Sequence, residues 1–168
     1  MRRRHNGFTL VELLVVIGIV ALLAGALLPV LAHARHSGWR VRCLTNLKAV
    51  GVGFRMYLND SDDIMPHAAA MPSLGLSEDP PISDVLAKYL SDPATLQCPA
   101  DREKDFFARE GSSYQYHVTL GGRKVEDSFL TERFGEAHTP VMYDYEPFHV
   151  HEQRPSSNFL FADMHVSD

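Results

Sequence analysis

A single carboxylate, Glu12, lies near the start of an otherwise uncharged apolar stretch. No Asp, Glu, Lys or Arg occurs between Leu13 and Ala32. Twenty apolar residues in a helix rise about 30 Å, which is the thickness of the hydrocarbon layer of a membrane. A charged side chain in such a helix costs roughly 2.5–3.5 kcal/mol at the membrane centre and less near its ends, so it normally has a partner. Glu12 is therefore the first candidate for a functional residue.

Potential metal ligands occur in two other places. The segment Asn59–Asp63 (NDSDD) offers alternating oxygens but lacks the glycine turn and the distal glutamate of an EF-hand loop. Calcium stays open there, beside the simpler interpretation of a solvated loop at a helix end. A zinc site could combine Asp144 or Asp163 with three histidines, which are His149, His151 and His165. Histidines on alternate strand positions are more often surface pairs, so we expect no zinc site.

Enzyme and nucleic-acid signatures are absent from the sequence. It contains no Gly-x-Ser-x-Gly elbow, no phosphate-binding glycine loop and no Cys-x-x-Cys pair. From Arg35 onward, thirteen Lys and Arg residues stand against twenty Asp and Glu residues, so no basic stripe can track phosphates. We therefore expect neither an enzyme nor a nucleic-acid-binding protein.

The N-terminus fits a cleaved signal peptide or a permanent anchor. Three arginines, Arg2–Arg4, precede the apolar stretch, and Ala32-His33-Ala34 supplies a small-x-small cleavage pattern at its end. The stretch exceeds the ~7–15 apolar residues of a signal-peptide core, which favours an anchor. Basic residues on the two sides balance, so they leave the orientation open.

The residues Gly7-Phe8-Thr9-Leu10-Val11-Glu12 closely resemble the processing site of type IV prepilins and type II secretion pseudopilins. The resemblance implies that a prepilin peptidase cleaves between Gly7 and Phe8, and that the new amine of Phe8 is methylated. It also implies an anchor in the bacterial inner membrane, with the rest of the chain outside the cytoplasm. Glu12 would then pair with the Phe8 amine of a neighbouring subunit. The alternative is a Glu12 that lies at the headgroup boundary or bonds the amine of its own chain.

Segments of the C-terminal part resemble a group of bacterial pseudopilin-like proteins that end in a processing-associated His-to-Asp-Gly segment. These segments are CLTNLKAVGVGFRMYLND, LQCPAD, SSYQYH, MYDYEPFH and SNFLFADMHV. The chain departs from that terminal pattern, because Met164 follows Asp163 where glycine is usual. Gln153 occupies the place of the histidine ten residues earlier.

Hydrophobic periodicity predicts that the helix continues beyond Ser37-Gly38. Apolar residues recur every three or four positions, at Val41, Leu44, Leu47, Val50, Phe54 and Leu58. Gly51 and Gly53 predict a close approach of sheet backbone, and Pro29 predicts a kink. We expect one helix from about Phe8 to about Asn59.

The remaining residues predict a small head. A loop is expected over Ile64–Pro81 and a short helix over Ile82–Leu90. Three segments are β-like, and a hairpin at Gly121-Gly122 should lead from the first of them into a weaker strand; the segments are Ser113–Leu120, Pro140–Tyr145 and Asn158–Val166. The fold class is α+β, a long helix packed on a head with an antiparallel sheet. The expected parts are a leader (1–7), a transmembrane assembly helix (8–34), its amphipathic continuation (35–60) and the head (61–168).

The two cysteines, Cys43 and Cys98, fit either one disulfide or two separate thiols. The orientation that the resemblance implies places both outside the cytoplasm. We therefore predict a disulfide that closes about 55 residues and contributes ~4 kcal/mol by the chain-entropy relation.

The sequence thus predicts a pilin-like or pseudopilin subunit that enters a type II secretion pseudopilus or a type IV pilus. Its expected partners are the inner membrane, the prepilin peptidase and other pilin subunits. Two alternatives stay open, a single-pass anchored extracytoplasmic binding module and an exported enzyme with an unrecognised site. Contacts between copies through the segment 13–30 would separate the first interpretation from the others.

Overall fold

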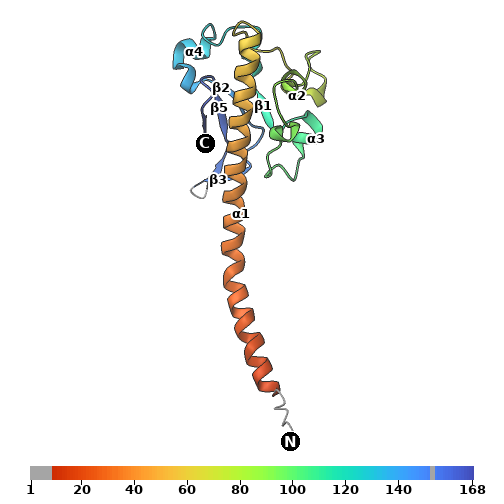
Figure 1. The fold of residues 1–168 in the computed structure, drawn as a ribbon, viewed down its shortest axis with the longest axis vertical. Coiled ribbons are helices and arrows are strands. Elements are labelled where there is room, and N and C mark those ends of the chain that lie inside the picture. The colour runs from red at the N-terminus through yellow and green to blue at the C-terminus, as the bar shows by residue number, and fades with distance from the viewer. Residues whose placement is uncertain (1–8, 152–153) are drawn as a thin grey trace, which may run out of the picture. The chain divides into compact units, whose positions relative to one another are not determined.

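One long helix and a small mixed head make up the computed structural model, which describes residues 9–151 and 154–168 (Figure 1). The helix α1 spans Leu10–Asp60, 51 residues. The chain divides into two compact units, Met1–His36 and Ser37–Asp168. The predicted α+β class, with an apolar N-terminal helix followed by an antiparallel sheet, is confirmed.

The N-terminal part of α1 is exposed along its described length. Every described residue from Thr9 to Gly38 is exposed, including leucines such as Leu22, at 73 %. The helix is long and apolar enough to cross a membrane. Pro29 lies inside α1, and the helix continues through it.

The second part of α1 is amphipathic, as predicted. Its buried residues return every three or four positions, so they share one face; they are Cys43, Leu47, Val50, Gly51, Gly53, Phe54 and Leu58. Val41, in contrast, is 60 % exposed. The helix ends at Asp60, and Asp62 and Asp63 then adopt positive φ angles of 51° and 60°, which turn the chain away.

The main sheet has four antiparallel strands in the order β1-β2-β5-β6. They are β1 (Tyr114–Tyr116), β2 (Pro140–Asp144), β5 (Phe159–Phe161) and β6 (Val166–Ser167). Tyr114 lies opposite Asp144, and Met142 lies opposite Leu160. A second, two-stranded sheet pairs β3 (His149–His151) with β4 (Arg154–Ser156).

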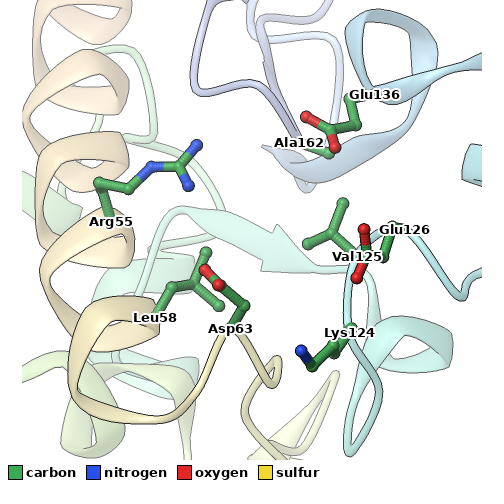
Figure 2. Close-up of a pocket in the computed structure, with 8 residues that line it drawn as sticks. All are labelled: Arg55, Leu58, Asp63, Lys124, Val125, Glu126, Glu136 and Ala162. Atoms are coloured by element: carbon green, nitrogen blue, oxygen red, sulfur yellow. The ribbon is translucent and has the colours of Figure 1, made fainter.

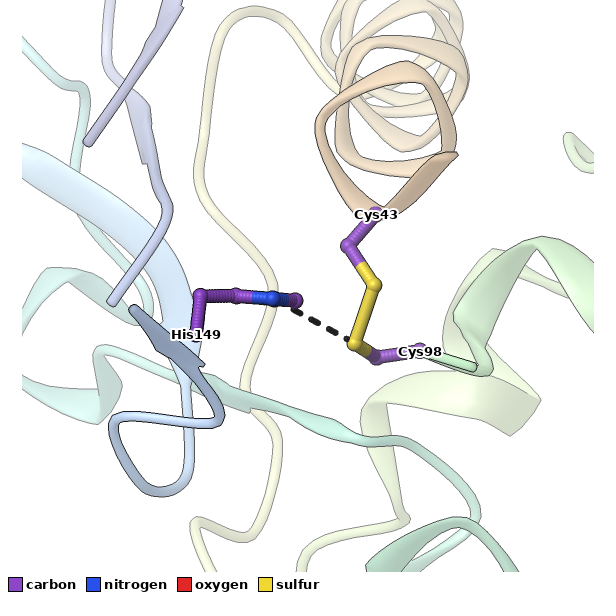
Figure 3. Close-up of side chains that lie close together, drawn as sticks. All are labelled: Cys43, Cys98 and His149. Carbon is purple, nitrogen blue, oxygen red and sulfur yellow. Dashed lines mark hydrogen bonds between the residues drawn. A yellow bond between two sulfur atoms is a disulfide. The ribbon is translucent and has the colours of Figure 1, made fainter. Parts of the chain in front are cut away.

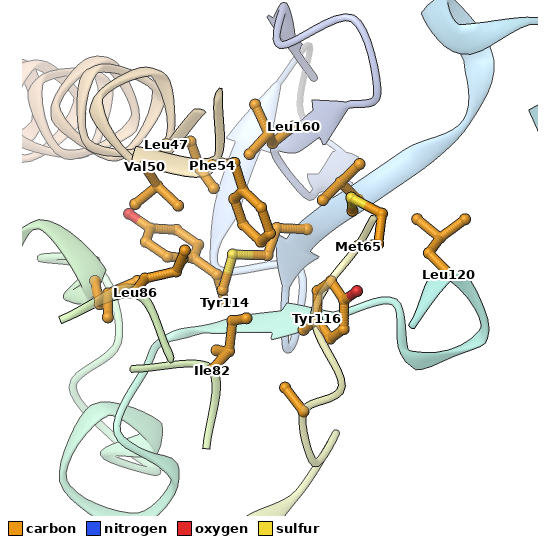
Figure 4. Packing of buried hydrophobic residues seen from close by; sticks show 14 of the residues in the cluster. Leu47, Val50, Phe54, Met65, Ile82, Leu86, Tyr114, Tyr116, Leu120 and Leu160 are labelled. Carbon is orange, nitrogen blue, oxygen red and sulfur yellow. The ribbon is translucent and has the colours of Figure 1, made fainter. Parts of the chain in front are cut away.

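The buried face of α1 packs on this sheet to form the core of the head (Figure 4). Phe54 lies between Tyr116 and Leu160, and both Phe54 and Leu160 are fully buried. Tyr114 and Tyr116 alternate with the half-buried Gln115, as a strand with one covered face requires. The Tyr116 hydroxyl donates to the Pro66 carbonyl at 2.9 Å, so its burial leaves no polar atom unpaired.

Short helices complete the head. They are α2 (Ile82–Leu86), α3 (Phe106–Glu110), α4 (Phe129–Phe134) and the 3-10 turns Pro72–Leu74, Pro93–Leu96, Val118–Leu120 and Glu136–His138. The predicted helix at Ile82–Leu90 exists, but α2 ends at Leu86. There the chain turns, and the Leu86 carbonyl accepts from the N–H groups of Tyr89 and Leu90.

The predicted hairpin at Gly121-Gly122 is wrong. Between Gly122 and Pro140 the described chain forms no strand, and β1 pairs instead with β2, far along the chain. The glycines serve a loop contact: the Gly122 N–H donates to the Met65 carbonyl at 2.8 Å. A Cβ on Gly121 would lie 3.0 Å from the Pro66 carbonyl oxygen. The Gly-Gly pair therefore marks a close approach of two loops.

Both helix glycines lie in tight contacts, but only Gly51 lies against the sheet as predicted. A Cβ on Gly51 would lie 2.9 Å from Leu160 Cδ1 and 3.5 Å from the Met164 carbonyl oxygen. The equivalent atom on Gly53 would lie 2.8 Å from Leu90 Cδ2. Gly51 therefore faces the sheet, whereas Gly53 faces the turn that follows α2.

Candidate functional site

The carboxylate singled out by the sequence, Glu12, caps the first turn of α1. Its Oε2 accepts from the Thr9 backbone N–H at 2.9 Å and from the Thr9 hydroxyl at 2.8 Å. In return, the Thr9 hydroxyl oxygen accepts from the Glu12 N–H at 3.2 Å. This reciprocal capping box satisfies two N–H groups that a helix start leaves unpaired. Within one chain, the hydrogen-bond partner of Glu12 is therefore Thr9. The sequence analysis did not predict this capping box, although the Thr-x-x-Glu spacing is typical of one.

The surface beyond Glu12 has the composition of a membrane or helix-packing segment. From Leu13 to Ala32 it carries no charge, and its Leu, Val and Ile side chains are mostly more than half exposed. In water such a surface would be strongly unfavourable, at roughly 25 cal/mol per Å² of exposed apolar area. It therefore needs lipid or other helices around it. The proposed cleavage residues, Gly7 and Phe8, lie outside the described residues.

A disulfide fastens α1 to the head. Cys43 on α1 and Cys98, after the turn Pro93–Leu96, are bonded to each other, with Cα atoms 5.1 Å apart and 55 residues between them in sequence. Both are fully buried. The Asn46 side-chain amide, one turn further along α1, donates to the Gln97 carbonyl at 2.8 Å. A covalent bond and a hydrogen bond thus join the same two segments.

A buried polar cluster lies against this disulfide, and the sequence analysis did not predict its contact with Cys98. His149, at the start of β3, places Nε2 3.5 Å from Cys98 Sγ and 3.6 Å from Asp144 Oδ2. The Asn158 backbone N–H donates to the same carboxylate at 2.7 Å. Burial raises the pKa of Asp144 to about 7, against the effect of the hydrogen bond from Asn158.

Among the side chains that the structure describes, His149 and His165 belong to no common group of metal ligands. His165 is partly exposed and pairs with Asp163, and its ring stacks on Phe161 at 4.5 Å between centroids. His149 is buried, and the described residues include no side-chain position for His151. Over 9–149 and 154–168, the potential metal ligands that come close together are Cys43, Cys98 and His149.

The acidic segment Asn59–Asp63 meets basic side chains of the same head. Asp60 accepts from Lys88 at 3.2 Å and from the Tyr89 hydroxyl at 3.1 Å. Asp63 lines a hollow of about 200 Å³ in which Arg55 and Lys124 lie beside Glu126 and Glu136 (Figure 2). Arg55 and Lys124 offset much of the acidic charge in this hollow, which lowers its attraction for a calcium ion.

An exposed, uncharged N-terminal helix that opens on a capped glutamate and continues into an α+β head is the architecture of a pilin. Residues 2–28 match the family model of the prokaryotic N-terminal methylation motif. The chain is also 35 % identical, over 96 residues, to the type IV wide pilus major component PilA4 of Thermus thermophilus. That match covers 57 % of this chain and 72 % of the relative. No solved structure matches the chain.

The chain therefore belongs to the type IV pilin-like family. The members of this family are structural subunits rather than enzymes. A membrane-anchored subunit that enters filaments accounts for both the exposed apolar helix and the compact head.

Proposed function

We propose that the chain is a filament subunit, made as a prepilin, cleaved between Gly7 and Phe8 and methylated on Phe8. The segment 8–34 then anchors it in the inner membrane and later packs against copies of itself. The segment 35–60 carries the head, 61–168, outside the cytoplasm. The prepilin peptidase and other pilin subunits are its partners.

The exposure of α1 carries this proposal. All described residues from Thr9 to Gly38 are exposed. A membrane covers this apolar surface in the precursor, and neighbouring helices can cover it in a filament. Glu12 is the one acidic residue on this surface. On assembly, the Glu12 carboxylate would give up its hydrogen bonds from Thr9 and pair with the Phe8 amine of a neighbouring subunit. This change of partner would link exit from the membrane to assembly.

A type IV pilus is the filament that we favour. The relative with 72 % of its length matched is named as the major component of a type IV wide pilus. A type II secretion pseudopilus is the second candidate, because the N-terminal motif resembles both classes of subunit. Isolation of surface filaments that contain this chain supports the pilus, and filaments confined to the envelope support the pseudopilus.

The mature N-terminus tests the processing step. Mass spectrometry of the membrane-extracted protein should find a chain that starts at Phe8 and carries one added methyl group. Replacing Gly7 should leave the leader attached. A mature chain that starts at Arg35 would mean that the apolar segment is an ordinary signal peptide, and the proposal would fail.

Crosslinking tests assembly against a single-pass binding module. A cysteine placed at Ile17 or Leu27, on the exposed surface of α1, should give crosslinked dimers in intact cells, and the double variant should give longer ladders. A cysteine at Glu132, on α4 in the head, is the matched control for random collision. Monomers alone from both helix positions, with normal membrane insertion, would favour the binding module.

A further inference from the structure

Three buried side chains from distant parts of the chain converge beside the disulfide. Cys43 comes from α1, Cys98 from the loop before α3, and His149 from β3 (Figure 3). The imidazole points at the disulfide, with Nε2 3.5 Å from Cys98 Sγ. The three candidate ligand atoms all lie within 4.8 Å of one another. No residue of the three is more than 3 % exposed.

A buried carboxylate lies next to the disulfide and His149. A disulfide sulfur is only a weak hydrogen-bond acceptor. The Asp144 carboxylate lies 3.6 Å from the same Nε2, and its side chain is fully buried. Asp144 Oδ1 has no hydrogen-bond partner among the described residues. Burying a carboxylate oxygen is costly unless a hydrogen bond or an opposite charge compensates it.

We propose that, when the disulfide is reduced, Cys43, Cys98 and His149 bind one zinc ion as three of its ligands, with the Asp144 carboxylate beside His149. Zinc prefers four sulfur, nitrogen or oxygen ligands in a tetrahedron, and two cysteines with one histidine are a frequent core of such sets. This set of ligands differs from the three C-terminal histidines that were considered in the sequence analysis, and it shares only His149 with them.

The distances fit this assignment. Bonds of about 2.3 Å to sulfur and 2.0–2.1 Å to nitrogen or oxygen put neighbouring tetrahedral ligand atoms about 3.3–3.8 Å apart. The separation of His149 Nε2 from Cys98 Sγ, 3.5 Å, already lies in this range. The two sulfur atoms must move apart, which loss of their covalent bond allows.

The chemistry balances with a dithiol as the reductant. The dithiol transfers two electrons and two protons to the Cys43–Cys98 bond and itself becomes a disulfide. Zinc then replaces the two thiol protons, which pass to solvent. Two thiolates match the charge of the ion, which lowers the cost of burying it. Disulfide and zinc therefore exclude each other, and each ties α1 to the same loop.

Metal binding by the full chain in detergent tests the proposal. The protein is reduced with dithiothreitol under mild denaturation, freed of reductant without oxygen, and refolded with or without zinc. The reduced chain should retain one zinc per molecule through gel filtration, and the oxidised chain should retain none. Cobalt in place of zinc should give the thiolate-to-metal absorption and the visible bands of a tetrahedral site.

Matched variants separate this site from adventitious binding. His149→Ala should weaken zinc binding at least tenfold and shift the cobalt spectrum, and Cys98→Ser should remove most of the thiolate absorption. His165→Ala, which removes an exposed histidine outside the cluster, should change neither. The oxidised forms of the variants that keep both cysteines are checked for the native circular dichroism spectrum. A reduced wild-type chain that retains no zinc, or a folded His149→Ala chain that binds like wild type, overturns the proposal.

Discussion

The ring of Phe54 on α1 stacks on the ring of Tyr116 on β1, with centroids 5.9 Å apart and planes 21° apart. Neither ring is more than 1 % exposed. This pair joins the helix to the sheet at the centre of the core. Stacked aromatic pairs contribute about 0.5–1.5 kcal/mol beyond the area that they bury.

Removal of the Phe54 ring should therefore strongly destabilise the head. Phe54→Ala should lower the free energy of unfolding by about 3–5 kcal/mol, because it leaves a cavity as well as losing contacts. Denaturant unfolding of the full chain in detergent, followed by head fluorescence, measures the effect. Val52→Ala, on the exposed side of the same helix, should change it by less than about 0.5 kcal/mol. Equal losses in the two variants would contradict this packing.

The disulfide between Cys43 and Cys98 should contribute measurably to stability. Replacing both cysteines with serine should lower the free energy of unfolding by about 4 kcal/mol, the chain-entropy value for a loop of this size. The comparison uses oxidised wild type, with a thiol assay to confirm that no free thiol is present. A double variant as stable as the oxidised wild type would show that the bond adds nothing.

Two glycines of α1 should respond in opposite ways to alanine. Gly38→Ala places its methyl group in open space, so it should gain up to about 1 kcal/mol in helix stability. Gly51→Ala would press its Cβ to 2.9 Å from Leu160 Cδ1, and should cost about 1–3 kcal/mol through overpacking. Melting temperatures of the two variants, compared with wild type, test the contrast. A gain in both would mean that Leu160 moves aside freely.

Glu12 should matter for assembly and not for folding. Glu12→Leu should insert, lose its leader and fold its head normally, yet give far fewer filaments, because the amine of a neighbour then stays unpaired in an apolar setting. Thr9→Val removes the partner within the chain and keeps the carboxylate, so it should assemble much better than Glu12→Leu. Sheared-filament yield gives the readout, with Glu132→Leu as the head control. Wild-type yield from Glu12→Leu would show that apolar packing alone suffices.

High pH should unfold the head through its tyrosines. Burial raises the pKa of Tyr114, Tyr116 and Tyr145 above the ordinary value near 10. The unfolded chain then loses phenolic protons that the folded chain keeps, so stability falls as the pH rises above about 10. Absorbance at 295 nm and circular dichroism, recorded over the same pH range, should show these tyrosines ionising only as the head unfolds. Full ionisation of a folded head would refute this, and Tyr116→Phe should reduce the pH dependence.

The sequence predicted those parts of the fold in which the spacing of apolar residues repeats over several turns of a helix or along a strand. The buried face of α1 from Leu47 to Leu58 and the strands near Tyr114, Val141 and Leu160 follow directly from period and composition. The helices α3 and α4 were missed, because five or six residues are too few to show a helical period. The contact of His149 with Cys98 joins residues 51 apart, and no local pattern encodes it.

The four-stranded sheet ends on one side in β6, of two residues, and on the other in β1, of three. Such short borders offer few unpaired backbone groups to a strand of another molecule. A second copy of the chain therefore finds little free strand edge to extend at β1 or β6. Association of copies by strand addition, a common route to uncontrolled aggregation of sheets, is disfavoured at both edges.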